Sequence, residues 1–247
     1  ASAVTGGGLV VGFAFTGCSI TPEPLPVANT KGAWTSNAFI QVLLDNTIRF
    51  YAARSEMGQG VTTGLATLVG EELDVNPFDM DIRLAGVHED YVNPLFGMQG
   101  TGGSTSIRAH YTQLRQAGAN TRALILEAAA RDLGVAASSL ATDNGYVVAG
   151  EARHPYSDFI ATARSLTIEA DAPLKAAAEF RFIGRESRRV DAIAKATGTA
   201  QFGIDVDIPG LHFAVVVRAP VAGAKLRSVE ASAARGMPRV TDEFEIG

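Results

Sequence analysis

Two glycine-rich segments, each followed by residues with helical spacing, constrain this chain more than any other feature of its sequence. The first is Glu56-Met57-Gly58-Gln59-Gly60, and the second, about forty residues later, is Gln99-Gly100-Thr101-Gly102-Gly103-Ser104-Thr105-Ser106. Glycine lacks the Cβ that would keep the main chain away from a ligand, and the first turn of a helix offers unpaired N–H groups and the positive end of its dipole. Both segments are therefore predicted to offer bare amides to an anionic cofactor, and their number indicates a large ligand with many hydrogen bonds.

Apolar periodicity around these segments predicts a mixture of strands and helices. Leu65, Leu68, Val69 and Leu73 fall on one face of a predicted helix. The expected elements, in chain order, are a hairpin of residues 38–44 and 47–53 around Asp45-Asn46, a helix over 61–73, a strand over 80–84, a helix of roughly 28 residues over 107–133, a hairpin over 140–149, a short helix over 156–165 and a buried strand over 211–218.

The composition excludes several classes of function. With 47% hydrophobic and 19% charged residues, the chain of 247 residues is expected to be globular, with the core of one large domain or one and a half ordinary ones. A net charge of −5 and four widely separated lysines give no basic stripe for a phosphate backbone, so nucleic acid is not an expected partner. The single cysteine, Cys18, excludes an intrachain disulfide and a cysteine-ligated zinc or iron–sulfur site within this chain. The four histidines lack ligand spacing, so no metal ligand is assigned.

The two glycine-rich segments, in this order and wording, resemble the large subunits of molybdenum hydroxylases, the xanthine dehydrogenase and aldehyde oxidoreductase superfamily. The most similar branch is that of the isoquinoline 1-oxidoreductase β-subunits. Short motifs in the second half resemble the opening of the small α/β hammerhead domain of that superfamily. These motifs are Arg189-Val190-Asp191, Lys195, Thr197-Gly198, Ala200, Phe202-Gly203, Asp205, Pro209-Gly210-Leu211 and Val217-Arg218-Ala219-Pro220. In most members the hammerhead precedes the first glycine-rich segment; here it follows, which is the order of the isoquinoline branch.

The resemblance, which covers nearly everything after Trp34, implies an α+β fold with three parts. Residues 1–33 would be an export-signal remnant and a tether, and residues 34–178 the first part of a molybdopterin-binding domain. Residues 179–247 would form an incomplete hammerhead domain. Its strand over 211–218 would leave an unpaired edge, so the domain is not expected to close its sheet alone.

The resemblance also implies a cofactor and the residues that bind it. The cofactor would be molybdopterin, in its cytosine dinucleotide form, and its dithiolene would hold the molybdenum without a protein ligand. Gln59 would hydrogen-bond the pyranopterin or its phosphate, and Gly103 to Ser106 would cradle phosphate at a helix N-terminus. The full set of expected cofactor-binding residues is Gly58, Gln59, Gly60, Gln99, Thr101, Gly102, Gly103, Ser104, Thr105 and Ser106.

By the same resemblance, the reaction would be hydroxylation of a carbon next to nitrogen or oxygen, in an N-heteroaromatic compound or an aldehyde. The base would be a glutamate near the far C-terminus of the large subunit, beyond Gly247, so no catalytic residue is assigned in this chain. The expected partners are the remainder of the large subunit, a small subunit with two-iron, two-sulfur clusters and a cytochrome electron acceptor.

Other interpretations of both segments stay open. Gly58-x-Gly60-x-x-x-Gly64 also fits a loose dinucleotide fingerprint of a flavin or nicotinamide enzyme. That fingerprint requires a parallel β-α-β crossover, whereas the preceding strand is expected to be one arm of a hairpin. Gln59 could instead cap a plain turn, and Ser104 or Thr105 could be an ordinary N-cap. The alternative function is a non-catalytic module for pterin or phosphate binding or for assembly.

Among the acidic residues, Glu56 is the only carboxylate beside a glycine-rich segment that could act on a substrate. Glu71-Glu72, Asp79 and Asp81 are expected on solvated faces.

The first eighteen residues are small and apolar, and Gly6 to Phe15 is typical of the hydrophobic region of an export signal whose charged start is missing. The run is too short to span a bilayer. Thr16-Gly17-Cys18 resembles a lipoprotein cleavage site, although Phe15 fits poorly before it. Members of the resembled branch often carry twin-arginine leaders, so the resemblance implies the periplasm.

Overall fold

The computed structural model describes residues 32–244. The predicted export-signal remnant and tether, apart from Gly32 and Ala33, lie outside the described residues. The chain divides into two units, Ala1–Ala200 and Gln201–Gly247, and each is described by itself.

The first unit contains a four-stranded sheet with the strand order β1-β2-β3-β4. Its strands are β1 (Trp34–Asn37), β2 (Ile40–Val42), β3 (Ile48–Ala52) and β4 (Asp81–Leu84). Strands β2 and β3 form the predicted hairpin, in which the amide of Leu43 donates to Thr47 O at 3.0 Å and Asn46 has a left-handed φ of 64°. Strand β1, which was not predicted from the sequence, adds an antiparallel strand beside β2.

Strands β3 and β4 run parallel, and helix α1 (Val61–Leu73) connects them. The bounds of α1 and its buried face are as predicted, because Leu65, Leu68, Val69 and Leu73 are all buried. The strand before loop Gly58–Gly60 is one arm of a hairpin, as predicted, but it also belongs to a parallel crossover, so the argument that this strand made against a dinucleotide fingerprint is wrong. Strand β3 is both an arm of the hairpin and the first strand of a parallel β-α-β unit, with the first glycine-rich segment between β3 and α1.

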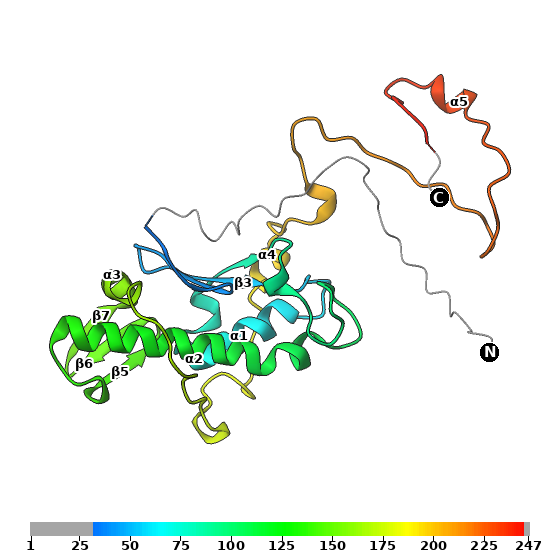
Figure 1. The fold of residues 1–247 in the computed structure, drawn as a ribbon. Coiled ribbons are helices and arrows are strands. Elements are labelled where there is room, and N and C mark those ends of the chain that lie inside the picture. Colours follow the sequence, from blue (N-terminus) through cyan, green and yellow to red (C-terminus); the bar gives the residue numbers. More distant parts are fainter. Residues whose placement is uncertain (1–31, 245–247) are drawn as a thin grey trace, which may run out of the picture. The chain divides into compact units, whose positions relative to one another are not determined.

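The longest element is helix α2 (Ser106–Leu133), whose 28 residues confirm the predicted length. Helices α1 and α2 pack side by side in the same direction (Figure 1). A methyl group on Gly64 would lie 2.7 Å from Ile107 Cδ1, and one on Gly118 would lie 2.7 Å from Val69 O. These glycines let the two backbones approach closely, and both helices begin at the same end of the pair.

A second sheet is an antiparallel meander of β5 (Leu140–Asp143), β6 (Tyr146–Ala149) and β7 (Ala152–Pro155). Strands β5 and β6 are the predicted hairpin, with Asn144 and Gly145 at left-handed φ angles of 43° and 81°. The predicted short helix is present as a 3-10 turn, η5 (Tyr156–Phe159), followed by α3 (Ile160–Ala163).

Short elements complete the first unit. They are the 3-10 turns η2 (Pro77–Asp79), η3 (Glu89–Tyr91), η4 (Ala137–Ser139) and η6 (Ala177–Glu179) and the helix α4 (Ala192–Ala196). The predicted α+β class is confirmed. Among residues 32–244, no helix is both long and apolar enough to span a membrane.

The described part of the second unit, residues 201–244, contains a 3-10 turn, η7 (Gly203–Asp205), a short helix, α5 (Ser232–Arg235), and no strand. The predicted buried strand over 211–218 is therefore wrong, and Phe213, Val215 and Val217 are 82%, 91% and 93% exposed. An apolar run becomes a strand only where a neighbouring strand pairs with its backbone, and residues 201–244 form no such pair.

Candidate functional site

The two glycine-rich segments, here called loop 1 (residues 55–60) and loop 2 (residues 99–105), are neighbours at the end of the helix pair where α1 and α2 begin. The amide of Ser55 in loop 1 donates to Thr101 Oγ1 in loop 2 at 2.9 Å. Two helix N-termini carry partial positive charge toward this region. The structure thus brings together the two segments that the sequence analysis assigned to one ligand.

Loop 1 binds its own glutamate. Glu56 Oε1 accepts hydrogen bonds from the amides of Gly58 at 2.8 Å and Gly60 at 2.9 Å, and Glu56 Oε2 accepts from the amide of Thr62 at 3.1 Å. This carboxylate occupies the position at the start of α1 where an anionic ligand would bind. The prediction of bare amides is therefore wrong for loop 1. A dinucleotide pyrophosphate would have to displace Glu56 to use them.

The charge of Glu56 is stabilised by its surroundings. Arg189 Nη2 lies 3.0 Å from Glu56 Oε1, and Arg189 Nη1 donates to Gly58 O at 2.5 Å. Partial burial raises the pKa of Glu56, but the amide hydrogen bonds and the charge of Arg189 outweigh it, so this pKa lies below its usual value. Glu56 is therefore ionised and fully hydrogen-bonded near neutral pH, which does not support the hypothesis that it acts on a substrate.

Gln59 lies on the exposed side of loop 1 and bonds within the loop. Its Oε1 accepts from the amide of Met57 at 2.5 Å, and its Nε2 donates to Ser55 O at 3.0 Å. This geometry is that of a turn residue. A glutamine amide has two N–H donors, and Ser55 O takes one of them.

Polar side chains fix the shape of loop 2. Gln99 Oε1 accepts from the amide of His88 at 3.2 Å, and Gln99 Nε2 donates to Gly86 O at 2.9 Å. The preceding segment and loop 2 are therefore joined at the start of the loop, as loops 1 and 2 are joined at Thr101.

Thr105 fixes the other end of loop 2. Its hydroxyl donates to Gly102 O at 2.9 Å and accepts from Asn93 Nδ2 at 2.8 Å, and only 3% of the residue is exposed. Thr105 stands at the N-cap position of α2, as predicted from the sequence, but its hydroxyl forms no capping hydrogen bond to the helix.

The middle of loop 2 has exposed donors that the protein does not use. Gly103 and Ser104 have left-handed φ angles of 57° and 53°, and both residues are exposed. Within residues 32–244, the hydroxyls of Ser104 and Ser106 make no hydrogen bond. Over the same part of the chain, no acceptor outside α2 bonds the amides of Ser106, Ile107 or Arg108. The first four N–H groups of a helix have no intrahelical partner, so the start of α2 keeps its capacity to bind an anion.

Gly103 also packs closely. A Cβ at this position would lie 3.1 Å from Phe96 Cζ, in addition to the strain of a positive φ. Any larger residue at Gly103 is therefore expected to distort loop 2.

A buried arginine lies at the base of both loops, a feature that the sequence analysis missed. Arg54 is 1% exposed and donates from Nη1 to Ala53 O at 2.5 Å and to Tyr91 O at 2.8 Å. Its Nη2 lies 2.8 Å from His110 Nε2, while His110 Nδ1 lies 2.9 Å from Ser106 O. A carbonyl can only accept, so Nδ1 of His110 carries the proton and Nε2 accepts from Arg54.

No opposite charge balances Arg54 in the described part of the chain. Among residues 32–244 it forms no ion pair, and its Nε is buried without a hydrogen-bond partner. Burial lowers the pKa of Arg54, and burial together with the charge of Arg54 lowers the pKa of His110, which stays neutral. The only sequence signal for this feature was a charged residue two positions after strand β3.

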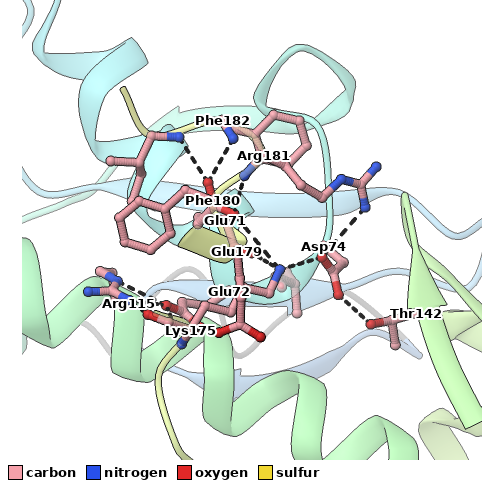
Figure 2. A network of polar contacts seen from close by, with 12 residues as sticks. Glu71, Glu72, Asp74, Arg115, Thr142, Lys175, Glu179, Phe180, Arg181 and Phe182 are labelled. Atoms are coloured by element: carbon pink, nitrogen blue, oxygen red, sulfur yellow. Dashed lines mark hydrogen bonds and ion pairs between the residues drawn. The ribbon is translucent and has the colours of Figure 1, made fainter. Parts of the chain in front are cut away.

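The prediction of a solvated face for Glu71 and Glu72 is wrong, because both residues are 0% exposed. Figure 2 shows why: each carboxylate has donors from distant parts of the chain. Glu72 Oε1 accepts from Arg115 Nε at 2.9 Å and from Arg115 Nη2 at 2.6 Å. Glu71 accepts from the three consecutive amides of residues 181–183 at 2.7–2.9 Å. Asp79 is exposed as predicted, whereas Asp81 is half-buried beside Arg49.

Lys175 completes this network and joins the same segment to α1. Its Nζ donates to Asp74 Oδ1 and to Glu71 O, both at 2.5 Å (Figure 2). Together with Glu71 and Glu72, it holds residues 175–183 against α1 and α2. The same chain segment continues to Arg189, the arginine that binds Glu56.

Comparisons with known proteins agree on one family. Residues 3–219 match the family of molybdopterin cofactor-binding domains. The chain is 30% identical over 245 residues to the isoquinoline 1-oxidoreductase β-subunit of Brevundimonas diminuta, an alignment covering 84% of this chain and 31% of that protein. It is 32% identical over 238 residues to the membrane-bound aldehyde dehydrogenase [pyrroloquinoline-quinone] of Gluconacetobacter polyoxogenes, covering 93% of this chain and 30% of that protein.

A third relative is a nicotinate dehydrogenase subunit of Pseudomonas putida, with 32% identity over 213 residues, covering 83% of this chain and 17% of that protein. The chain therefore spans less than a third of the length of each of these relatives.

Proposed function

Because this chain belongs to the molybdopterin cofactor-binding family of the molybdenum hydroxylases, we propose that it is the part of a large subunit that binds the phosphate of molybdopterin at the start of helix α2. The observation that carries this proposal is the difference between the two loops. The amides of loop 1 already bind Glu56, whereas within residues 32–244 no acceptor outside α2 bonds the amides of Ser106, Ile107 or Arg108 and the hydroxyls of Ser104 and Ser106 make no hydrogen bond.

The groups at loop 2 fit a phosphate. Gly103 and Ser104 are exposed and lie in a turn just before α2, and successive backbone N–H groups in a turn can form an anion-binding concavity. The buried guanidinium of Arg54, with an unpaired Nε, provides positive charge nearby. In this proposal Gly102, Gly103, Ser104 and Ser106 contact the cofactor.

The remaining predicted site residues would act in two ways. Gln59 would offer its second amide hydrogen to the pterin or its phosphate. Gln99, Thr101 and Thr105 would fix the shape of loop 2, and Gly58 and Gly60 would hold loop 1 closed around Glu56.

When bound, the cofactor would supply molybdenum for oxidation of a carbon next to nitrogen or oxygen. The family match favours molybdopterin, although the name of one relative specifies pyrroloquinoline quinone. The relatives' names support an N-heterocycle or an aldehyde as substrate. This chain would contribute binding loops and no base, since Glu56 is bound within loop 1 and another part of the large subunit would supply the catalytic glutamate.

We also propose that the cofactor is the cytosine dinucleotide form and that the protein is periplasmic. The proposed partners are the remainder of the large subunit, a small subunit with iron–sulfur clusters and a cytochrome acceptor. Residues 34–178 would form a cofactor-binding part and residues 179–247 a hammerhead part. The alternative function is a non-catalytic module for pterin or phosphate binding that acts without the rest of a hydroxylase. The hydrogen bonds of Glu56 within loop 1 would fit this alternative, because they leave Glu56 unable to act as a base.

Two substitutions in loop 2 test the proposal. Gly103→Val should abolish cofactor retention, because valine is strained at a positive φ and its side chain would meet Phe96. Ser104→Ala should lose on the order of 1 kcal/mol, because the neighbouring amides and Ser106 remain. Both variants would be produced with the remaining subunits, and the nucleotide released by acid hydrolysis would be measured per protein.

The expected order is a nearly empty Gly103→Val variant and a mostly loaded Ser104→Ala variant. Equal loading of both variants at the level of the unaltered protein would show that loop 2 does not contact the cofactor.

A further inference from the structure

The buried pair of Arg54 and His110 carries a positive charge that no acid compensates in the described part of the chain. A fully buried charge is costly unless an opposite charge compensates it. Every other cation buried to a comparable degree in the described residues has an acid: Arg115 pairs with Glu72 at 2.6 Å, and Lys175 pairs with Asp74 at 2.5 Å. Arg54 alone, within residues 32–244, has only carbonyl oxygens and a neutral imidazole around it.

The hydrogen bonds of Arg54 lead to the start of α2. Arg54 bonds His110 at 2.8 Å, and His110 bonds the carbonyl of Ser106, the first residue of α2, at 2.9 Å. Two hydrogen bonds and the imidazole ring of His110 therefore connect the guanidinium of Arg54 to the first turn of α2. This is the helix turn whose amides have no acceptor outside α2 in the described part of the chain. At the start of α1 the negative charge of Glu56 already balances the helix dipole, whereas at the start of α2 no acid does so in the described part of the chain.

We propose that Arg54 is an electrostatic positioning residue, whose uncompensated buried charge strengthens the binding of a phosphate-bearing ligand at the start of α2 through His110. The inference rests on the proposed function, because it assumes an anion at loop 2. Arg54 does not contact the anion; it makes the potential at the helix terminus more positive. For charges on the order of 10 Å apart in a partly buried site, removing one charge is expected to weaken binding about tenfold.

Substitution of Arg54 tests this proposal with inorganic pyrophosphate as the probe and the full chain as the protein. Arg54→Gln removes the charge but keeps an amide donor for Ala53 O or Tyr91 O. Arg54→Lys keeps the charge. Arg49→Met is the matched control, because Arg49 lies on the strand just before Arg54 but is paired with Asp81 at 2.7 Å. Affinity would be measured by titration calorimetry at fixed ionic strength, and folding by circular dichroism.

We expect Arg54→Gln to bind pyrophosphate about tenfold more weakly, Arg54→Lys to stay within about threefold and Arg49→Met to be unchanged. A second measurement needs no variant. The chain has four histidines, so their ring signals can be followed by NMR during a pyrophosphate titration. The His110 signal should shift, whereas that of His154 on β7 should not.

Each outcome decides between the two proposals. If Arg54→Gln binds as the unaltered chain does and His110 does not respond, while Gly103→Val abolishes binding, the inference is wrong and the proposed function holds. If the unaltered chain does not bind pyrophosphate, both are wrong. If Arg54→Gln does not fold, an unchanged His110 signal in the unaltered chain at saturating pyrophosphate is enough to contradict the inference.

Discussion

Loop 1 and loop 2 carry similar glycine-rich sequences at the starts of two adjacent helices that run in the same direction. The amides of loop 1 are hydrogen-bonded to a carboxylate of the chain, whereas, over residues 32–244, those at the start of α2 are not. In loop 1 a carboxylate from the chain itself, that of Glu56, bonds the amides of Gly58, Gly60 and Thr62. In loop 2 the threonine at the N-cap turns away from the helix to bond Gly102 O and Asn93. A glycine-rich segment before a helix therefore predicts amide donors, but a nearby acid decides whether a ligand can use them.

The difference assigns separate roles to the loops. Loop 1 is held rigid from within and by Arg189, and it presents Gln59 outward. Loop 2 is fixed at both ends but open in the middle. We therefore expect substitutions in loop 1, apart from Gln59, to act mainly on loop order and stability, and substitutions in loop 2 to act on anion binding.

Gln59 is the one loop 1 side chain proposed to contact the cofactor, and its substitution is expected to have the largest effect on cofactor binding among the loop 1 variants. Gln59→Leu should weaken cofactor binding by one to two orders of magnitude, because a hydrogen bond to a charged group contributes roughly 1.5–3 kcal/mol. Molybdenum and pterin content of the assembled enzyme would be measured, with circular dichroism as the control for folding. Full loading with normal turnover would make Gln59 a turn residue only and would leave all contacts to loop 2.

The next effect concerns the internal carboxylate. Glu56→Ala should lower the free energy of unfolding by about 1–2 kcal/mol, as the loss of a helix cap does, and should leave three amides at the start of α1 without their acceptor. Urea unfolding followed by the fluorescence of the single tryptophan, Trp34, would measure it. Glu127→Ala is the matched control, because its i,i+4 pair with Arg131 is exposed and should contribute less than about 0.5 kcal/mol. Equal losses in both variants would show that Glu56 does not hold loop 1.

A smaller effect is expected from pH. The folded-state pKa of Glu56 lies below its usual value of about 4.5, so the stability that Glu56 adds is present above the unfolded pKa. It is lost as the pH falls through the lower, folded-state pKa. Amide exchange at Gly58, Gly60 and Thr62 should therefore stay slow from pH 7 to about 5 and accelerate, beyond the intrinsic pH trend, below about 4.5. Glu56→Gln should remove this pH dependence, and its persistence in that variant would point to another group.

Local pattern predicted the elements that depend on local interactions. The spacing of Leu65, Leu68, Val69 and Leu73 gave α1 its bounds, and the turn residues at Asn46 and Asn144 gave both hairpins. The parallel pairing of β3 with β4 was missed, because it depends on a crossover that no short window of sequence contains.

Electrostatic features depended on residues far away in the chain. Glu71 and Glu72 were wrongly expected to be solvated, because the local sequence shows no donor for either carboxylate. Their donors are Arg115, Lys175 and the amides of residues 181–183, which are 43 to 112 positions away. The reverse error occurred at residues 211–218, where an apolar run predicted a strand without any partner to pair with. For the candidate site, the sequence identified both loops, but it could not show that Glu56 closes one of them or that Arg54 lies buried beneath them.

Whether loop 2, and not loop 1, is the anion site is tested most directly by backbone amide NMR of the chain titrated with pyrophosphate. We expect the amides of Ser104, Ser106 and Ile107 to shift progressively with saturation, while those of Gly58, Gly60 and Thr62 keep their positions. Shifts confined to Gly58, Gly60 and Thr62 would show that the ligand displaces Glu56 at α1, and would contradict the assignment of the anion site to loop 2.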